Sequence, residues 1–187
     1  MEDWNLQRLV DRQEITDLIY LYCRGLDRAD EATLRRIYHE DAIEDRGPGL
    51  FVGNAHEWIG WTMKVLPAFV VTQHCVLNIL LDIDGDTAFG ESYFQAYHRF
   101  AGGPGTERTE IKWPEAGTEM ILAGRYLDRF ERRDNVWKIA HRRMVNDWCR
   151  TQPVADAWFD ENPTAYRAVK DISDASLRGE IEPGRAN

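Results

Sequence analysis

The sequence has few cysteines and no long apolar run, and both absences exclude classes of protein. Among its 187 residues are three cysteines, Cys23, Cys75 and Cys149, an odd number without CxxC spacing. Neither a disulfide framework nor a cysteine zinc cluster is therefore expected. No apolar run approaches the ~20 residues that a membrane-spanning helix needs, and the first residues, 1–4, are acidic where a signal peptide is basic. We therefore expect a cytoplasmic protein.

Positive charge is also scarce, since the net charge is −9. Nucleic acid and anionic membrane surfaces both require a basic face, so neither is expected as a partner. The five histidines show no HxxxH or HxH spacing and the chain has no glycine-rich phosphate loop. The sequence therefore predicts no metal and no organic cofactor. A chain of this length predicts one domain with a sizeable core.

Helical periodicity dominates the first third of the chain. Apolar residues recur every three or four positions from Asp3 to Arg24, which predicts a helix with one apolar stripe. This stripe comprises Leu6, Leu9, Val10, Ile15, Leu18, Ile19 and Tyr22. We expect Gly25 to end this helix with a positive φ. Second and third helices are predicted after the N-caps Asp30 and Asn54.

From Phe69 onward the period changes from 3.6 to 2, which indicates strands. We expect four long strands at 70–83, 87–100, 118–132 and 136–148, joined in two places by the short turns 84–86 and 133–135. Helices followed by a meander predict an α+β fold in which helices close the concave face of a curved antiparallel sheet, giving a cone. A further helix is expected after Pro153. The single domain would then span 1–172, followed by a polar, disordered tail at 173–187.

Asp27 and His74 are the candidate catalytic pair. An aspartate just past a helix C-terminus either caps a turn or is held there for chemistry, because the helix dipole disfavours it. His74 interrupts a strand otherwise made of Val, Leu and Ile. A neutral imidazole beside a carboxylate is a common general-base arrangement. Tyr22, earlier on the same helix, is either a donor to a leaving group or a core tyrosine with a satisfied hydroxyl.

Strand alternation sorts the remaining candidates. If His74 points inward, Asn78 does as well, and Phe94, Ala96 and His98 follow on the next strand. For Arg142 three alternatives stay open: it contacts a substrate oxygen, it pairs with a protein carboxylate, or Arg143 points inward instead. The candidate substrate-binding residues are Arg142, Asn146, His98, Asn78, Trp58 and Phe94. The outward residues of the first long strand are also apolar, which favours a homo-oligomer, a dimer or a trimer.

The chain resembles the SnoaL-like branch of the nuclear transport factor two-like superfamily. The resemblance covers roughly residues 3–150 and is carried by the Tyr22-x4-Asp27 unit, the capped third helix, His74, and the strand-turn-strand run 124–139. Members closest in pattern are the bile acid 7α-dehydratases and the lindane dehydrochlorinases, with scytalone dehydratase more distant. Where the bile acid enzymes carry an Asp and an Arg, this chain has Ala96 and Asn146.

The resemblance implies a cystatin-like cone, no cofactor, and an Asp27–His74 pair that removes a proton while a leaving group departs, with Tyr22 as the family tyrosine. We therefore expect a lyase that eliminates water or formaldehyde from a hydroxylated aromatic compound, for example a diarylpropane diol from lignin. The alternatives are an isomerase or cyclase with the same base, and a non-catalytic module such as a dioxygenase small subunit or a ligand-binding protein.

Overall fold

The computed structural model of the protein describes residues 5–101, 114–155, 170–171, 174 and 176, and it confirms the α+β class. The helices are α1 (Leu6–Asp27), α2 (Glu31–Ile37), α3 (Ala55–Val65) and the 3-10 helix η1 (Leu66–Ala68). The strands are β1 (Tyr38–Asp45), β2 (Val52–Asn54), β3 (Phe69–Asp84), β4 (Thr87–Phe100), β5 (Thr118–Arg133) and β6 (Val136–Pro153).

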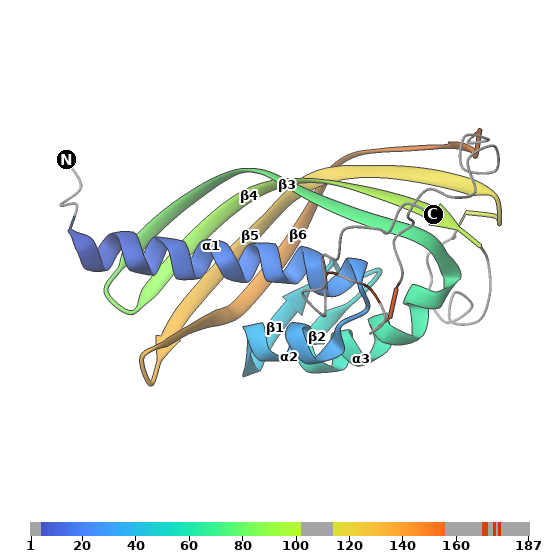
Figure 1. Ribbon diagram of the computed structural model, residues 1–187. Coiled ribbons are helices and arrows are strands. Elements are labelled where there is room, and N and C mark those ends of the chain that lie inside the picture. The colour runs from blue at the N-terminus through green and yellow to red at the C-terminus, as the bar shows by residue number, and fades with distance from the viewer. Residues whose placement is uncertain (1–4, 102–113, 156–169, 172–173, 175, 177–187) are drawn as a thin grey trace, which may run out of the picture.

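The six strands form one curved sheet in the order β2-β1-β6-β5-β4-β3. Figure 1 shows the helices on one side of this sheet, with α1 running under the long strands. Neighbouring strands pair antiparallel except β1 and β6, which are parallel. The four long strands thus pair antiparallel as expected, whereas β1, which pairs parallel with β6, was not predicted. Its charged segment 39–41 hides an alternation in which Ala42 and Glu44 are buried.

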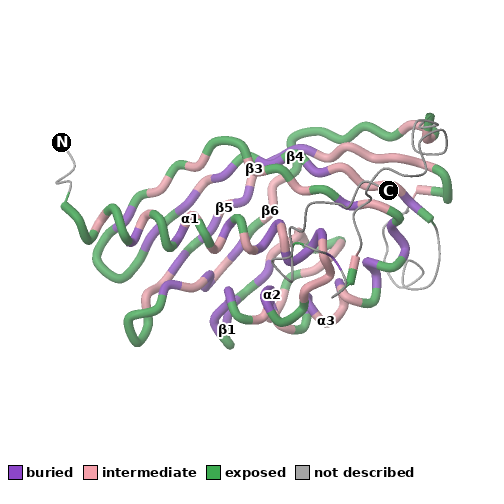
Figure 2. The backbone as a smooth tube through the Cα atoms, viewed as in Figure 1, coloured by how far each residue is buried: buried purple, intermediate pink, exposed green. Residues whose placement is uncertain are grey.

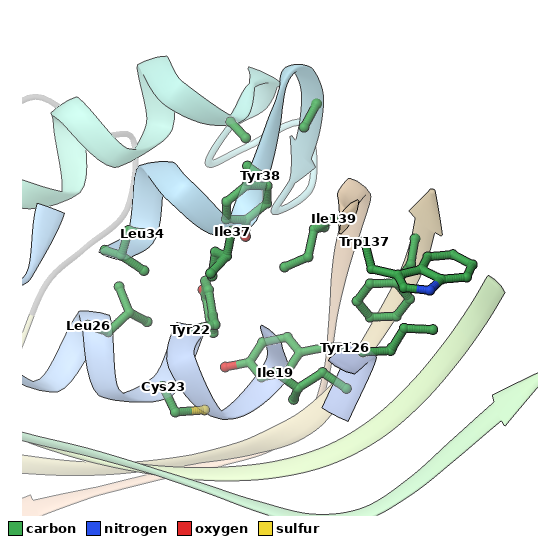
Figure 3. Packing of buried hydrophobic residues seen from close by; sticks show 14 of the residues in the cluster. Ile19, Tyr22, Cys23, Leu26, Leu34, Ile37, Tyr38, Tyr126, Trp137 and Ile139 are labelled. Atoms are coloured by element: carbon green, nitrogen blue, oxygen red, sulfur yellow. The ribbon is translucent and has the colours of Figure 1, made fainter. Parts of the chain in front are cut away.

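Helix α1 covers the concave face with a stripe of apolar residues. Asn5 caps it by accepting from the backbone N–H of Arg8 at 2.9 Å. Ile15, Ile19 and Tyr22 have no exposed surface. Figure 3 shows Tyr22 between residues of the α2–β1 segment and Tyr126 of β5. The first members of the predicted stripe, Leu6, Leu9 and Val10, are instead exposed.

Gly25 does not end α1, which continues to Asp27. At this end of the helix the residue with a positive φ is Ala29, at 50°. Gly25 has a different role, because a Cβ there would lie 2.7 Å from the Leu34 side chain of α2. Glycine therefore permits close packing of α1 against α2. Asp27 lies on the last turn of α1 and not beyond it, and it is buried.

A register shift in β3 changes which side chains point inward. The pairing of β3 with β4 is regular from Val71 to Val76 and resumes at Ile79. Thr72 on one side of the shift and Ile83 on the other are both buried, whereas Asn78 is exposed. The strict alternation that predicted an inward Asn78 is broken by the bulge, so its assignment to substrate binding was wrong.

The convex side of the sheet carries exposed apolar side chains. They include Leu77 and Leu80 of β3 and Phe89 and Tyr93 of β4. Figure 2 shows such exposed positions alternating with buried ones along the strands. Of these, Leu77 belongs to the outward residues of the first long strand from which an oligomer was expected, and the oligomer stays a prediction.

The expected C-terminal helix and tail fall mostly on 156–169 and 177–187, outside the described residues. In the described part of the chain no helix is long and apolar enough to cross a membrane.

Gly25→Ala tests the packing role of this glycine. Alanine favours a helix by about 1 kcal/mol over glycine, but here we expect a net loss of ~1–3 kcal/mol in the free energy of unfolding, because Leu34 is buried and must shift. Gly60→Ala on α3 is the matched control, since its nearest neighbour would be the Arg35 Nη2 atom at 3.6 Å. Urea unfolding should show Gly60→Ala stabilised; a stabilised Gly25→Ala would contradict the packing role.

Candidate active site

Asp27 and His74 contact each other twice. The backbone N–H of His74 donates to Asp27 Oδ2 at 2.8 Å, and its ring Nδ1 lies 2.7 Å from Asp27 Oδ1. The two side chains are 12% and 9% exposed, so the contact is largely shielded from water. The expected proximity of the last turn of α1 and the beginning of β3 is confirmed. The catalytic role of the pair stays a prediction.

The double contact determines the protonation pattern of the ring. A carboxylate only accepts hydrogen bonds, so Nδ1 of a neutral His74 carries the proton and Nε2 has a free lone pair. No described residue hydrogen bonds to Nε2. The backbone contact also fixes the carboxylate, so the ring cannot rotate without losing its acceptor. His74 is thus an oriented base with one free nitrogen.

His74 lines a cavity of about 150 Å³ between the sheet and the helices. Its walls are mostly apolar and include the predicted residues Trp58, Phe94, Ala96 and His98. The remaining lining residues are Leu26, Arg46, Leu50, Trp61, Thr62, Val65, Leu66, Phe69, Thr72, Met120, Leu122, Tyr126 and Met144. An apolar cavity of about 150 Å³ holds one benzene ring.

His98 lies beside His74 in the cavity wall, on the neighbouring strand β4. The two rings are 5.4 Å apart and nearly perpendicular. Burial, together with the charges of His74 and Lys170, lowers the pKa of His98 to about 3. His98 is therefore neutral at physiological pH and can exchange hydrogen bonds with a ligand, but it is no proton reservoir.

Three buried polar atoms of cavity-lining residues have no hydrogen-bond partner within the described structure. They are Nδ1 of His98 and the Oγ1 atoms of Thr62 and Thr72. Buried polar groups are nearly always paired, because an unpaired one costs about 1–3 kcal/mol. Their concentration around one apolar cavity is typical of a binding site for a molecule with a few polar groups.

Lys170 lies beside the cavity-lining residue Phe69. Its Nζ donates to the Phe69 carbonyl oxygen at 3.4 Å and lies 5.6 Å from the ring centroid. Burial lowers the pKa of Lys170 to about 8, although Asp27 acts to raise it. No sequence pattern singled out this residue, because the segment before it was expected to be a helix.

Arg142 does not reach the cavity. Its guanidinium is fully buried and forms two parallel bonds to Asp128, at 2.7 and 2.6 Å. It also stacks on Tyr22 and Tyr126, with ring centroids 3.9 and 4.4 Å from Cζ. Of the three alternatives, pairing with a protein carboxylate is therefore correct. Arg143 is exposed and pairs with Asp45, and the substrate-binding assignment of Arg142 was wrong.

Tyr22 and Asn146 also lie outside the cavity lining. The Tyr22 hydroxyl accepts from Arg46 in a fully buried position, and burial raises the pKa of Tyr22 to about 12. This is the core tyrosine with a satisfied hydroxyl, not a donor to a leaving group. Asn146 is exposed. It lies next to a register shift in the pairing of β5 with β6, and this shift interrupts the regular alternation of inward and outward side chains. Neither residue remains a candidate.

Arg46 is a cavity-lining residue that the sequence analysis missed. It directly follows β1, and its side chain is only 7% exposed. It pairs with the fully buried Glu44 at 2.6 Å, and its Cζ lies 4.4 Å from the Trp58 ring centroid. Strand alternation could have revealed Arg46, because Glu44 and Arg46 are two residues apart and so point to the same side of a strand. This strand, however, was not predicted.

Most of the chain matches one known family. It matches the SnoaL-like domain over residues 7–143, well over half of its length, and therefore belongs to that family. No curated protein matches it.

Three solved structures show the same fold. Hexachlorocyclohexane dehydrochlorinase LinA type 3 from Novosphingobium barchaimii is 24% identical with a TM-score of 0.62, covering 80% of this chain and 94% of that one. A candidate scytalone dehydratase from Novosphingobium aromaticivorans is 22% identical with a TM-score of 0.62, covering 90% and 97%. A protein with a cystatin-like fold from Nostoc punctiforme is 18% identical with a TM-score of 0.52, covering 74% and 92%. The fold is thus shared with dehydrochlorinase and dehydratase enzymes.

The lowered pKa of His98 predicts a pH-dependent stability. Because the pKa is about 3 in the folded protein and 6.5 in the reference state, the unfolded chain binds more protons between these values. The free energy of unfolding is therefore unaffected by protonation of His98 above pH ~6.5. It decreases as the pH falls towards 3, and at pH ~5 it has lost about 2 kcal/mol. His98→Gln lacks the titrating group, so its unfolding free energy should depend less on pH in this window.

Urea unfolding at several pH values measures this difference. Gln73→Ala, an exposed change on β3, should keep the wild-type pH dependence. Equal slopes for wild type and His98→Gln would show that His98 titrates normally in the fold.

Proposed function

We propose that the protein is a lyase that eliminates water or formaldehyde from a small hydroxylated aromatic molecule, with His74 as the base. The observation that carries this proposal is the double contact of Asp27 with His74, which leaves one ring nitrogen free at the wall of an apolar cavity. A binding module has no need for an imidazole oriented in this way. Positioned acid–base catalysis is worth ~10²–10⁴ in rate.

The proton path is short in either elimination. For loss of water, Nε2 takes a proton from carbon, the electron pair forms the double bond, and the departing oxygen recovers the proton from the imidazolium. For loss of formaldehyde, Nε2 takes the hydroxyl proton, the carbon–carbon bond breaks, and the carbanion is protonated by the same imidazolium. Asp27 stabilises the imidazolium in both cases. His74 thus both removes the proton and returns it. No second acid is needed, which is consistent with a neutral His98.

The cavity volume restricts the substrate. A space of about 150 Å³ accommodates one aromatic ring, and because the cavity is partly open, the second ring of a diarylpropane would extend out of it. Monocyclic aromatic alcohols and diols are therefore the first substrates to test. Trp58 and Phe94 supply flat walls for such a ring.

Other parts of the proposal rest on sequence. Independence of metals and organic cofactors, a cytoplasmic location and a homo-oligomeric state remain predictions. An isomerase or cyclase would use the same base, so the product is what distinguishes it from a lyase.

His74→Ala should leave the protein folded and reduce kcat by about 10²-fold or more, because no other group accepts the proton at that place. Asp27→Asn keeps the volume but removes the charge that holds the imidazolium, so it should also slow turnover. Because the two residues act as one unit, the double variant should be little worse than the worse single variant.

The substrate is found by a mass-spectrometric screen of monocyclic aromatic diols for loss of water or CH₂O.

Gln73→Ala is the matched control, since it lies next to His74 and is exposed; it should keep full turnover. Melting curves establish that each variant is folded. Full turnover by a folded His74→Ala protein would reject the lyase mechanism and favour a ligand-binding role.

A further inference from the structure

The guanidinium of Arg46 is under-satisfied for a buried group. Its Nε donates to Glu44 Oε1 at 2.6 Å and Nη2 donates to the Tyr22 hydroxyl, whereas the Met144 sulfur, at 2.7 Å, is the only hydrogen-bond acceptor of Nη1 among the described residues. An arginine has five N–H donors and a thioether is a weak acceptor. Two donors thus have no acceptor within the described structure, and a third has a poor one.

The charged partner of Arg46 lies away from the cavity. Glu44 has no exposed surface, is absent from the cavity lining, and also accepts from the Tyr38 hydroxyl at 2.8 Å. Both of its oxygens are therefore occupied on the core side. A molecule in the cavity meets the guanidinium and not the carboxylate.

Arg46 and His74 reach the cavity from strands that lie far apart in the sheet order. Arg46 follows β1 and His74 lies on the edge strand β3, with β6, β5 and β4 between these two strands. Both residues line the same cavity of about 150 Å³. A single ring that fills this space therefore has His74 at one side and Arg46 at another.

We propose that Arg46 binds an anionic oxygen on the aromatic ring of the ligand, a phenolate or a ring carboxylate. This deepens the proposed function by naming the substrate class and rests on it for the location of the site, but ligand binding does not require turnover. A guanidinium is permanently charged and forms strong, charge-assisted bonds to such oxygens. Trp58 and the apolar wall around it exclude water, which strengthens the attraction.

4-Nitrophenol is the probe, because its phenolate is yellow and its phenol is not. At a pH below its solution pKa, the folded wild-type protein should bind it as the phenolate, which lowers the apparent pKa of the bound probe by ~1 unit or more. 4-Nitrobenzoate should compete, which tests the carboxylate. Nitrobenzene, of similar shape but uncharged, should bind about 10-fold more weakly or worse.

Variants assign the effect to Arg46. Removing Arg46 alone would leave Glu44 buried and uncompensated, so the informative variant is Glu44→Gln with Arg46→Met, which removes both charges. It should bind nitrobenzene and 4-nitrophenol alike and give no yellow band. Arg143→Met is the matched control, because Arg143 is exposed and pairs with Asp45; it should behave as wild type.

Two outcomes would overturn the proposal: wild-type protein that binds nitrobenzene as tightly as 4-nitrobenzoate, or a folded double variant that keeps the phenolate band. The wild-type comparison is decisive even if the double variant does not fold. His74→Ala separates this proposal from the lyase mechanism, since it should still bind 4-nitrobenzoate more tightly than nitrobenzene whether or not turnover is lost.

Discussion

The structure depends on one contact, the carboxylate of Asp27 on the backbone and ring of His74. It joins the last turn of α1 to the edge strand β3 and so fixes one side of the cavity. The same contact orients the imidazole with Nε2 free. A buried carboxylate is costly to desolvate unless it is well hydrogen-bonded. Here the carboxylate receives two hydrogen bonds from a single residue, which compensates for its burial.

A second polar cluster supports the opposite side of the site. Arg142 and Asp128 are direct cross-strand partners and almost fully buried. They hold Tyr22 and Tyr126 by stacking, and the Tyr22 hydroxyl in turn accepts from Arg46. The residues that resembled catalytic groups in the sequence therefore form a scaffold behind the cavity wall. Arg46 and Tyr126 are the members of this cluster that line the cavity, and Arg46 is the charged one of the two, which is why it is the one assigned to a ligand.

Much of the fold was predictable from periodicity, because the long strands alternate and the helix caps are local signals. The pairing of Asp27 with His74 was predictable from the resemblance together with an imidazole in an apolar strand. Asn78 and Asn146 were misplaced by bulges, which sequence alternation does not reveal. Gly25 was misassigned because close packing against Leu34 and a positive φ both require glycine. Arg46 was missed because its position depends on the parallel pairing of β1 with β6, a non-local feature.

The protonation state of His74 tests the central claim most directly. ¹⁵N NMR of the histidine side chains, with His74 assigned by its loss in His74→Ala, shows which ring nitrogen carries the proton. The account predicts a neutral His74 protonated on Nδ1, with an unprotonated Nε2, because Asp27 Oδ1 is the acceptor 2.7 Å away. A neutral His74 with its proton on Nε2 would place a donor, not a base, at the cavity and would contradict the account.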